Sequence, residues 1–214
     1  MNKKLVIAVS LTAVAALFFV GSYFYKASEI KRVESLAQSN KVYFEREHSP
    51  SLGSTMARVT LVEFLDPECE ACRAFYPFIK EILKDFGGGV RLVIRYAPFH
   101  HNSKFAVQLL EAARKQGLYW EAMDLFFEHQ PEWGDHHNPQ PEKLWGYLEK
   151  AGVDVDKARE DMKDPAIMEM IELDIKDGAR LGARRTPTFF INGKPLENFG
   201  FEGLRAQIQR EMDR

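Results

Sequence analysis

The sequence has little cysteine and almost no net charge. Its 214 residues include two cysteines, and 29 basic residues nearly balance 31 acidic ones, which leaves a formal charge of -2. Two cysteines cannot supply the four thiolates of an all-cysteine zinc site. Because a balanced chain carries no basic field, we expect no nucleic-acid partner. No internal repeat or low-complexity tract interrupts the chain, so one globular body with an elaboration fits its length.

Charge is also missing from one long stretch near the N-terminus. Leu5 to Tyr25 contains no charged residue, and basic residues flank both of its ends. A run of this length can span a bilayer, so residues 1–25 are predicted to be a signal anchor with the short N-terminus inside and the body outside. The small residues Val20-Gly21-Ser22 leave signal cleavage open as the alternative.

The rest of the chain divides into a spacer and a folded domain. Residues 26–41 are charged and weakly periodic, which indicates a helical or flexible stalk rather than a packed element. We assign residues 42–214 to the folded domain. It begins with a strand-like piece, "VYFE" at Val42 to Glu45, and a turn-rich connection leads to "RVTLVEFL" at residues 58–65, which is apolar on both faces as an interior strand would be.

Helical periodicity then alternates with strand patterns. Apolar residues spaced by three and four positions from Phe75 to Phe86 predict a helix that ends before three glycines, and residues 90–99 read as a second strand. From about residue 102 to 183 the period is helical almost throughout. Strands then return on either side of Asn192-Gly193, a favoured hairpin turn, and a final helix follows.

Both cysteines lie in "FLDPECEACRAFYP", Phe64 to Pro77, at the start of the first predicted helix. Unpaired backbone N–H groups and the helix dipole favour an anion there, so Cys69 is placed to be a reactive thiolate. Cys72 lies about one turn along, less exposed, and could close a disulfide or attack a mixed disulfide formed at Cys69. Two other roles stay open: zinc or Cu(I) binding together with a histidine, and an inert structural disulfide.

With these residues in view, the chain resembles the DsbA-like thiol-disulfide oxidoreductases of the thioredoxin superfamily. "VTLVEFLDPECEACRAFYP" is similar to that family's strand leading into the active site, and "RTPTFFING" to its proline loop and following hairpin. The resemblance covers about Val42 to the C-terminus. It implies an α/β thioredoxin fold with an inserted helical domain at about residues 102–183, here preceded by the predicted transmembrane helix.

The resemblance also implies roles for single residues. Cys69 matches the nucleophile and Cys72 the resolving cysteine, while Pro187 matches the cis-proline facing them and Thr186 the residue whose backbone pairs with an extended substrate. Glu63 occupies the position of the family's buried acid, where burial would raise its pKa and fit it to exchange protons with Cys72. Without the resemblance, the residues favour an ordinary trans turn at Thr186-Pro187 and leave open a solvent-exposed carboxylate at Glu63.

The implied function is disulfide exchange with cysteine-containing proteins in the bacterial cell envelope. The implied partners are protein thiols or disulfides, an unidentified redox recycling protein and the membrane, and the only redox group is the Cys69–Cys72 disulfide, with no further cofactor. We expect a single-pass inner-membrane protein with its catalytic domain in the periplasm, or a soluble periplasmic one after cleavage. A disulfide reductase or isomerase, and a copper- or zinc-handling thiol protein, are the alternatives.

Acidic residues beside the cysteines depart from the family pattern. Glu70-Ala71 separates the cysteines here, whereas the family's strongest oxidant has Pro-His. Glu68 and Glu70 should disfavour the thiolate, so we expect a Cys69 pKa above the value of about 3.5 known for DsbA, and a weaker oxidant. The pairs His100-His101 and His136-His137 read as loop histidines, and neither is assigned to the site.

Overall fold

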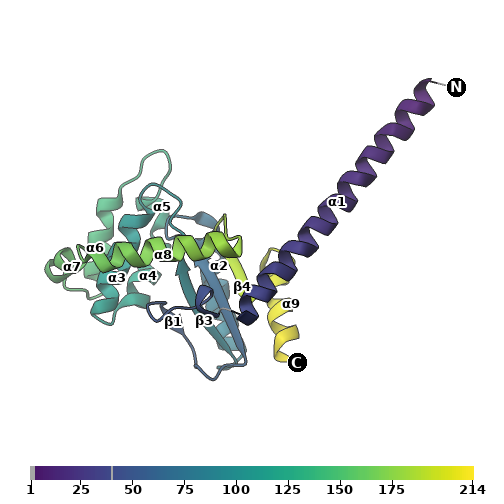
Figure 1. Ribbon diagram of the computed structural model, residues 1–214. Helices are drawn as coiled ribbons and strands as arrows, with labels where there is room; N and C mark the ends of the chain where they lie inside the picture. Colours follow the sequence, from purple (N-terminus) through teal and green to yellow (C-terminus); the bar gives the residue numbers. More distant parts are fainter. Residues whose placement is uncertain (1–2, 40) are drawn as a thin grey trace.

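The computed structural model describes residues 3–39 and 41–214 and centres on a mixed five-stranded sheet of order β1-β3-β2-β4-β5 (Figure 1). Its strands are β1 (Ser51–Leu52), β2 (Val59–Leu65), β3 (Val90–Tyr96), β4 (Thr188–Ile191) and β5 (Lys194–Pro195). β2 and β3 are parallel, while β1, β4 and β5 each pair antiparallel with their neighbour. The strand predictions for β2, β3 and β4 are confirmed.

β2 lies between β3 and β4, and it is buried on both faces because its side chains alternate between two apolar layers. Leu61 and Leu65 join the core that includes helix α2 (Glu70–Asp85). Val62 and Phe64 face a second core with Leu181. By the same alternation, Glu63 projects toward the α2 side of the sheet.

A block of helices connects β3 to β4 and lies to one side of the sheet in Figure 1, with α8 returning across it. The block consists of α3 (Ser103–Lys115), α4 (Tyr119–Glu128), α5 (Gln130–Trp133), η2 (Pro141–Lys143), α6 (Leu144–Lys150), α7 (Val155–Asp161) and α8 (Pro165–Leu181). The Asp164 side chain caps α8 by accepting from the Ala166 N–H at 3.0 Å. Gly182, with φ of 80°, ends α8 in the left-handed conformation that glycine adopts most readily.

The strand expected at "VYFE" is wrong. Lys41–Tyr43 forms the short 3₁₀ helix η1, and the edge of the sheet is taken by β1 instead. Phe44 is nevertheless buried, with its ring 5.2 Å from that of Phe190. The apolar residues of this segment therefore pack against the sheet without joining its hydrogen-bond ladder.

The hairpin after β4 has the expected turn. Asn192 and Gly193 both have positive φ, 49° and 78°, as the favoured two-residue hairpin turn requires. β5 is short, and just beyond it the Leu196 N–H still donates to the Phe189 carbonyl of β4 at 3.0 Å. The final helix, α9 (Phe201–Met212), is confirmed.

The N-terminal helix α1 (Lys3–Ser39) projects away from the body in Figure 1. Its segment Leu11–Val33 has a mean hydropathy of 1.2, which by length and composition alone is enough to cross a membrane. Residues 26–39 of the predicted stalk are helical, but the stalk is also packed against the body at Arg32 and Val33. Val33 is 4 % exposed, and Arg32 Nη1 donates to the Arg180 carbonyl at 2.9 Å. The division at residues 25 and 41 stays a prediction.

A buried group of charges ties the segment after α1 to the sheet and to α8. Arg95 on β3 is fully buried and donates to Asp174 Oδ1 at 2.7 Å and to Asp177 Oδ2 at 2.8 Å. Arg46 binds the same Asp177 at 2.7 Å, and His48 Nε2 lies 2.7 Å from Asp174. Burying these charges costs free energy, which is offset only while each charge keeps its oppositely charged partners.

Replacing Arg95 with Gln should therefore lower the free energy of unfolding by about 3 kcal/mol, since two buried carboxylates lose a shared cation. Guanidinium unfolding of the full chain in detergent measures this loss. Arg210→Gln is the matched control, because the Arg210–Glu197 pair is exposed and should contribute less than about 1 kcal/mol. Equal losses in the two variants would show that the buried group does not hold the fold.

Candidate active site

Cys69 occupies the N-cap of α2, directly after the loop that leaves β2. The carbonyl of Cys69 accepts the Arg73 N–H at 3.1 Å, while its sulfur receives hydrogen bonds from the backbone N–H groups of Ala71 and Cys72. Those N–H groups belong to the first turn of the helix, which has no intrahelical acceptors for them. The expected position at a helix N-terminus is confirmed.

Cys72 lies beneath Cys69 and is fully buried. Burial raises the pKa of Cys72 well above the ordinary thiol value, and its hydrogen bond to Cys69 and the charge of Glu63 raise it further. Cys72 is therefore a neutral thiol that donates its proton toward Cys69. The two sulfurs are thus near each other but chemically unlike.

The pKa of Cys69 is lowered to about 6. The hydrogen bond from Cys72 is the main cause; burial opposes it, and hydrogen bonds from the Thr186 hydroxyl and from the backbone N–H groups add to it. Near neutral pH, Cys69 is mostly a thiolate. These hydrogen bonds therefore lower the pKa of Cys69 by more than burial raises it.

Thr186 and Pro187 lie beside the cysteines, at the start of β4. Their peptide bond is cis, and the Thr186 carbonyl lies 3.4 Å from the Cys69 sulfur. The side chain of the next residue, Thr188, donates to the Arg185 carbonyl at 2.7 Å. Residues more than one hundred positions apart in the sequence thus meet at one sulfur, as the resemblance implies.

Glu63 is 1 % exposed, so a carboxylate that reaches solvent is wrong for this position. Neither of its side-chain oxygens has a hydrogen-bond partner among the described residues. Burial, with a smaller effect from the Cys69 charge, raises the pKa of Glu63 to about 8. Glu63 is consequently a neutral acid at pH 7, and its charge influences Cys72 when it ionises.

The acidic residues on either side of Cys69 have partners of their own. Glu68 is 2 % exposed and accepts from the backbone and side-chain amides of Asn102 at 2.7 and 2.8 Å, at the start of α3. Glu70 is exposed and pairs with His136 Nε2 at 2.8 Å. Each negative charge is partly offset by these donors, which the sequence analysis did not foresee.

Two residues that the sequence analysis left outside the site lie at its rim. His100 Nδ1 is 2.7 Å from Asp66 Oδ2, and its ring lies 5.3 Å from that of His136. Gln130 of α5 donates to the carbonyls of Pro67 and Cys69 at 2.8 and 3.0 Å. The only signal in the sequence for His100 was its place just after a strand, whereas nothing local marked Gln130.

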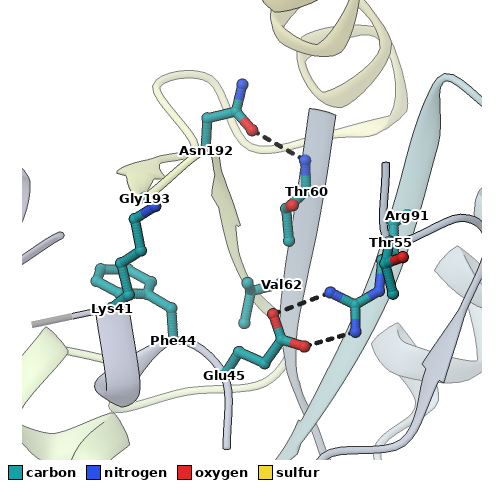
Figure 2. A pocket seen from close by; sticks show the side chains of 9 residues that line it. All are labelled: Lys41, Phe44, Glu45, Thr55, Thr60, Val62, Arg91, Asn192 and Gly193. Carbon is teal, nitrogen blue, oxygen red and sulfur yellow. Dashed lines mark hydrogen bonds and ion pairs between the residues drawn. The ribbon is translucent and has the colours of Figure 1, made fainter. Parts of the chain in front are cut away.

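Two of the cavities among the described residues differ in their position relative to the cysteines. One of about 330 Å³ lies beside the first turn of α2 and is lined by Glu70, Arg73, Gln130, Pro131, Gly134, Asp135, His136 and His137. Figure 2 shows another, of about 430 Å³, along the first half of β2 and the hairpin turn, where Arg91 pairs with Glu45 at 2.5 Å. The cysteines follow the far end of β2, so this second cavity is separate from them. No group of three or more His, Cys, Asp or Glu side chains among the described residues is arranged to hold a metal ion.

The sequence and the fold both match known proteins. A family model described as Thioredoxin matches residues 45–210, which is most of the chain. The thioredoxin-like oxidoreductase from Silicibacter pomeroyi DSS-3 superposes with a TM-score of 0.68 at 26 % identity, over 82 % of this chain and 96 % of that chain. The thiol-disulfide exchange protein α-DsbA2 from Wolbachia pipientis superposes with a TM-score of 0.72 at 23 % identity, over 86 % of this chain and 97 % of that chain, and so supports the fold alone.

Curated relatives match over a smaller share of their own length. The Na⁺/H⁺ antiporter NhaA of Herminiimonas arsenicoxydans is 35 % identical over 144 residues, which is 67 % of this chain but 22 % of the antiporter. This chain thus spans less than a quarter of the curated relatives it matches, and their ion transport is not assigned to it. The family match over most of the chain shows that it belongs to the thioredoxin family, and the shared fold agrees with this assignment.

Proposed function

We propose that this chain exchanges disulfides with cysteine-containing proteins of the bacterial cell envelope, with Cys69 as the nucleophile and Cys72 as the resolving cysteine. One observation carries the assignment: the pKa of Cys69 is lowered to about 6 whereas that of fully buried Cys72 is raised. A thiolate starts exchange and a neutral buried thiol does not. No cofactor besides the Cys69–Cys72 disulfide enters the proposal.

In the oxidising direction, a substrate thiolate attacks the Cys69 sulfur of the enzyme disulfide, and Cys72 leaves. Glu63, protonated below its pKa of about 8, gives its proton to the departing Cys72 sulfur. A second substrate thiolate then attacks the substrate sulfur of the mixed disulfide and releases Cys69 as a thiolate. The substrate gains one disulfide and the enzyme gains two electrons, which a recycling partner must remove.

Thr186 is the proposed contact for an extended substrate, because its carbonyl lies against the nucleophilic sulfur. A peptide with a cysteine at Cys69 would lie along the Thr186-Pro187 segment before β4. The exposed apolar helix α1 supports a membrane-tethered periplasmic domain, and a cleaved signal peptide is the alternative. A Cys69 pKa of about 6 also favours a milder oxidant than DsbA, whose value is about 3.5, so a reductase or isomerase is the second candidate.

Trapping tests the two cysteine roles. In a reduced Cys72→Ser variant, Cys69 should attack an unfolded, disulfide-bonded protein and remain linked to it, because the residue that would release it is missing. A non-reducing gel with mass spectrometry of the adduct measures this. Cys69→Ser is the control and should form no adduct, since Cys72 is fully buried. Adducts formed equally by both variants would contradict the assignment.

Titration of Cys69 tests the redox poise. Thiolate absorbance of the reduced full chain in detergent should show a midpoint near pH 6, and Cys69→Ser should lose that transition. Equilibration with glutathione should then give a less oxidising protein than DsbA, because the reduced form gains less from its thiolate. A midpoint near 3.5 would contradict the milder poise, and one near 9 would contradict a reactive Cys69.

Stoichiometric zinc or Cu(I) retained through Cys69, without exchange activity, would favour the metal-handling alternative.

Glu63→Gln tests the proton carrier. Gln cannot donate or accept a proton, so protonation and deprotonation of Cys72 should slow by about a hundredfold. The rate of this step should also lose its dependence on pH near 8. Stopped-flow exchange with a model disulfide peptide, followed from pH 5 to 9, measures this. Glu202→Gln, at an exposed position, is the control. An unchanged profile in the Glu63 variant removes this residue from the reaction.

Stability against pH gives an independent readout for Glu63. Its pKa is about 8 in the folded chain, above the ordinary 4.5, so the folded state holds a proton that the unfolded state releases in between. Stability from this group is complete below pH 4.5 and falls as the pH rises toward 8, by about 1.4 kcal/mol per pH unit. The Gln variant should lack this fall, and an identical slope in both proteins would mean that Glu63 ionises normally.

A further inference from the structure

The connection between α8 and β4 carries exposed positive charge. Residues 178–196 include no acidic residue, whereas Arg180, Arg184 and Arg185 fall within them. Arg184 and Arg185 are exposed, and neither side chain forms a hydrogen bond or an ion pair with any residue that the structure describes. Arg180, by contrast, lies over the Tyr43 ring at 5.2 Å. Two adjacent guanidinium groups therefore present their charge to whatever lies outside this surface.

Helix α1 lies against the same connection, and Figure 1 shows it leaving the body beside β4. Val33 of α1 is 4 % exposed and belongs to the same core cluster as the end of α8. Arg32 Nη1 donates to the Arg180 carbonyl at 2.9 Å. Arg184 lies near enough to Glu29 of α1 for the two charges to interact, although Arg32 already binds the Glu29 carboxylate at 2.8 Å. The last turns of α1 and the connection are therefore packed together.

This packing brings the connection close to the bilayer when α1 spans it. The charge-free run of α1 ends at Tyr25, so the bilayer surface lies near Lys26. Val33 lies seven positions further along the helix, which at about 1.5 Å per residue is about 10 Å. That height is close to the Debye length of about 8 Å at physiological salt, so surface charge still acts there. A span that reached Val33, where the apolar segment ends, would bring the connection to the surface itself.

We propose that Arg184 and Arg185 bind anionic lipid headgroups of the membrane that holds α1, as a second point of attachment for the body. Guanidinium groups bind phosphate oxygens through paired hydrogen bonds, and each basic residue close to an anionic surface strengthens binding by about fivefold. Thr186 follows Arg185 directly, and its carbonyl lies 3.4 Å from the Cys69 sulfur. The second attachment thus holds the proposed active site at the bilayer surface. The inference rests on the proposed membrane tether.

Hydrogen–deuterium exchange of the full chain in lipid nanodiscs tests this attachment. The discs contain either phosphatidylcholine alone or equal parts of phosphatidylcholine and anionic phosphatidylglycerol. Backbone amides of residues 183–186 should exchange at least about fivefold more slowly in the anionic discs, because the bound connection is held against the surface. Amides of the Asn192-Gly193 turn, at the other end of β4, should exchange alike in both discs.

Substitutions separate lipid binding from a change in the fold. Arg184→Gln/Arg185→Gln should lose the lipid-dependent slowing, and Arg184→Lys/Arg185→Lys should keep most of it because both charges remain. Lys157→Gln/Lys163→Gln is the matched control, since it removes two exposed charges that precede α8 and should leave the slowing intact. Inorganic phosphate added to the phosphatidylcholine discs should not slow exchange, which distinguishes a membrane surface from a site for free phosphate.

Kinetics in detergent address an acidic substrate, the other ligand that two arginines beside Thr186 could bind. In a neutral detergent without lipid, kcat/KM for oxidation of an acidic peptide dithiol by the oxidised full chain should be the same in wild type and Arg184→Gln/Arg185→Gln. A loss confined to the acidic peptide, with a neutral peptide unaffected, would assign the arginines to substrate binding and overturn the proposal.

The outcomes distinguish this proposal from the tether on which it rests. A chain that inserts into both discs but exchanges alike in them, or that free phosphate alone protects, would overturn the role of the arginines and leave α1 as the anchor. Slowing that survives in Arg184→Gln/Arg185→Gln would overturn it too. A full chain that inserts into neither disc would contradict the tether and the lipid attachment together, while disulfide exchange by Cys69 would stand.

Discussion

The hydrogen bond from the Cys72 thiol to the Cys69 sulfur is the interaction on which this site depends. It is the largest cause of the low Cys69 pKa, and it also raises the pKa of Cys72. One contact thus makes the outer sulfur more acidic and the inner one less so. The contact exists because α2 begins at the end of β2, which places the two sulfurs one helical turn apart over the sheet. Any displacement of that helix start would weaken both effects together.

The inner side of the cysteine pair is buried away from water, whereas hydrogen-bond donors lie around the Cys69 sulfur on the outer side. Glu63 is buried and has no hydrogen-bond partner among the described residues, and the low dielectric around it keeps it protonated at neutral pH. On the outer side, the Thr186 side chain and the backbone N–H groups of Ala71 and Cys72 donate to the Cys69 sulfur. A proton can therefore be held beneath the pair while negative charge is stabilised above it. That division suits a reaction in which one sulfur becomes an anion as the other is protonated.

The sequence predicted what short-range pattern controls. The helix start at Cys69 and the turn at Asn192 each depend on a few neighbouring residues. Contacts between distant segments could not be predicted from the sequence. "VYFE" has the composition of a strand, yet it packs against Phe190 through Phe44 without joining the sheet. The partners of Glu68 and Glu70 were invisible for the same reason. Pro187 and Thr186 were assigned to the site only through the family resemblance, because nothing local distinguishes them from an ordinary turn.

The inserted helices take part in the site as well as extending the fold. Gln130 of α5 donates to the carbonyls of Pro67 and Cys69, and its own oxygen accepts from Arg73 Nε at 3.1 Å. The insertion therefore holds the loop in front of α2 from outside the thioredoxin core. His136, from the loop after α5, adds a second link through Glu70. Because the helix N-terminus acts on Cys69 only while this loop keeps its shape, the insertion contributes to the acidity of a sulfur it does not contain.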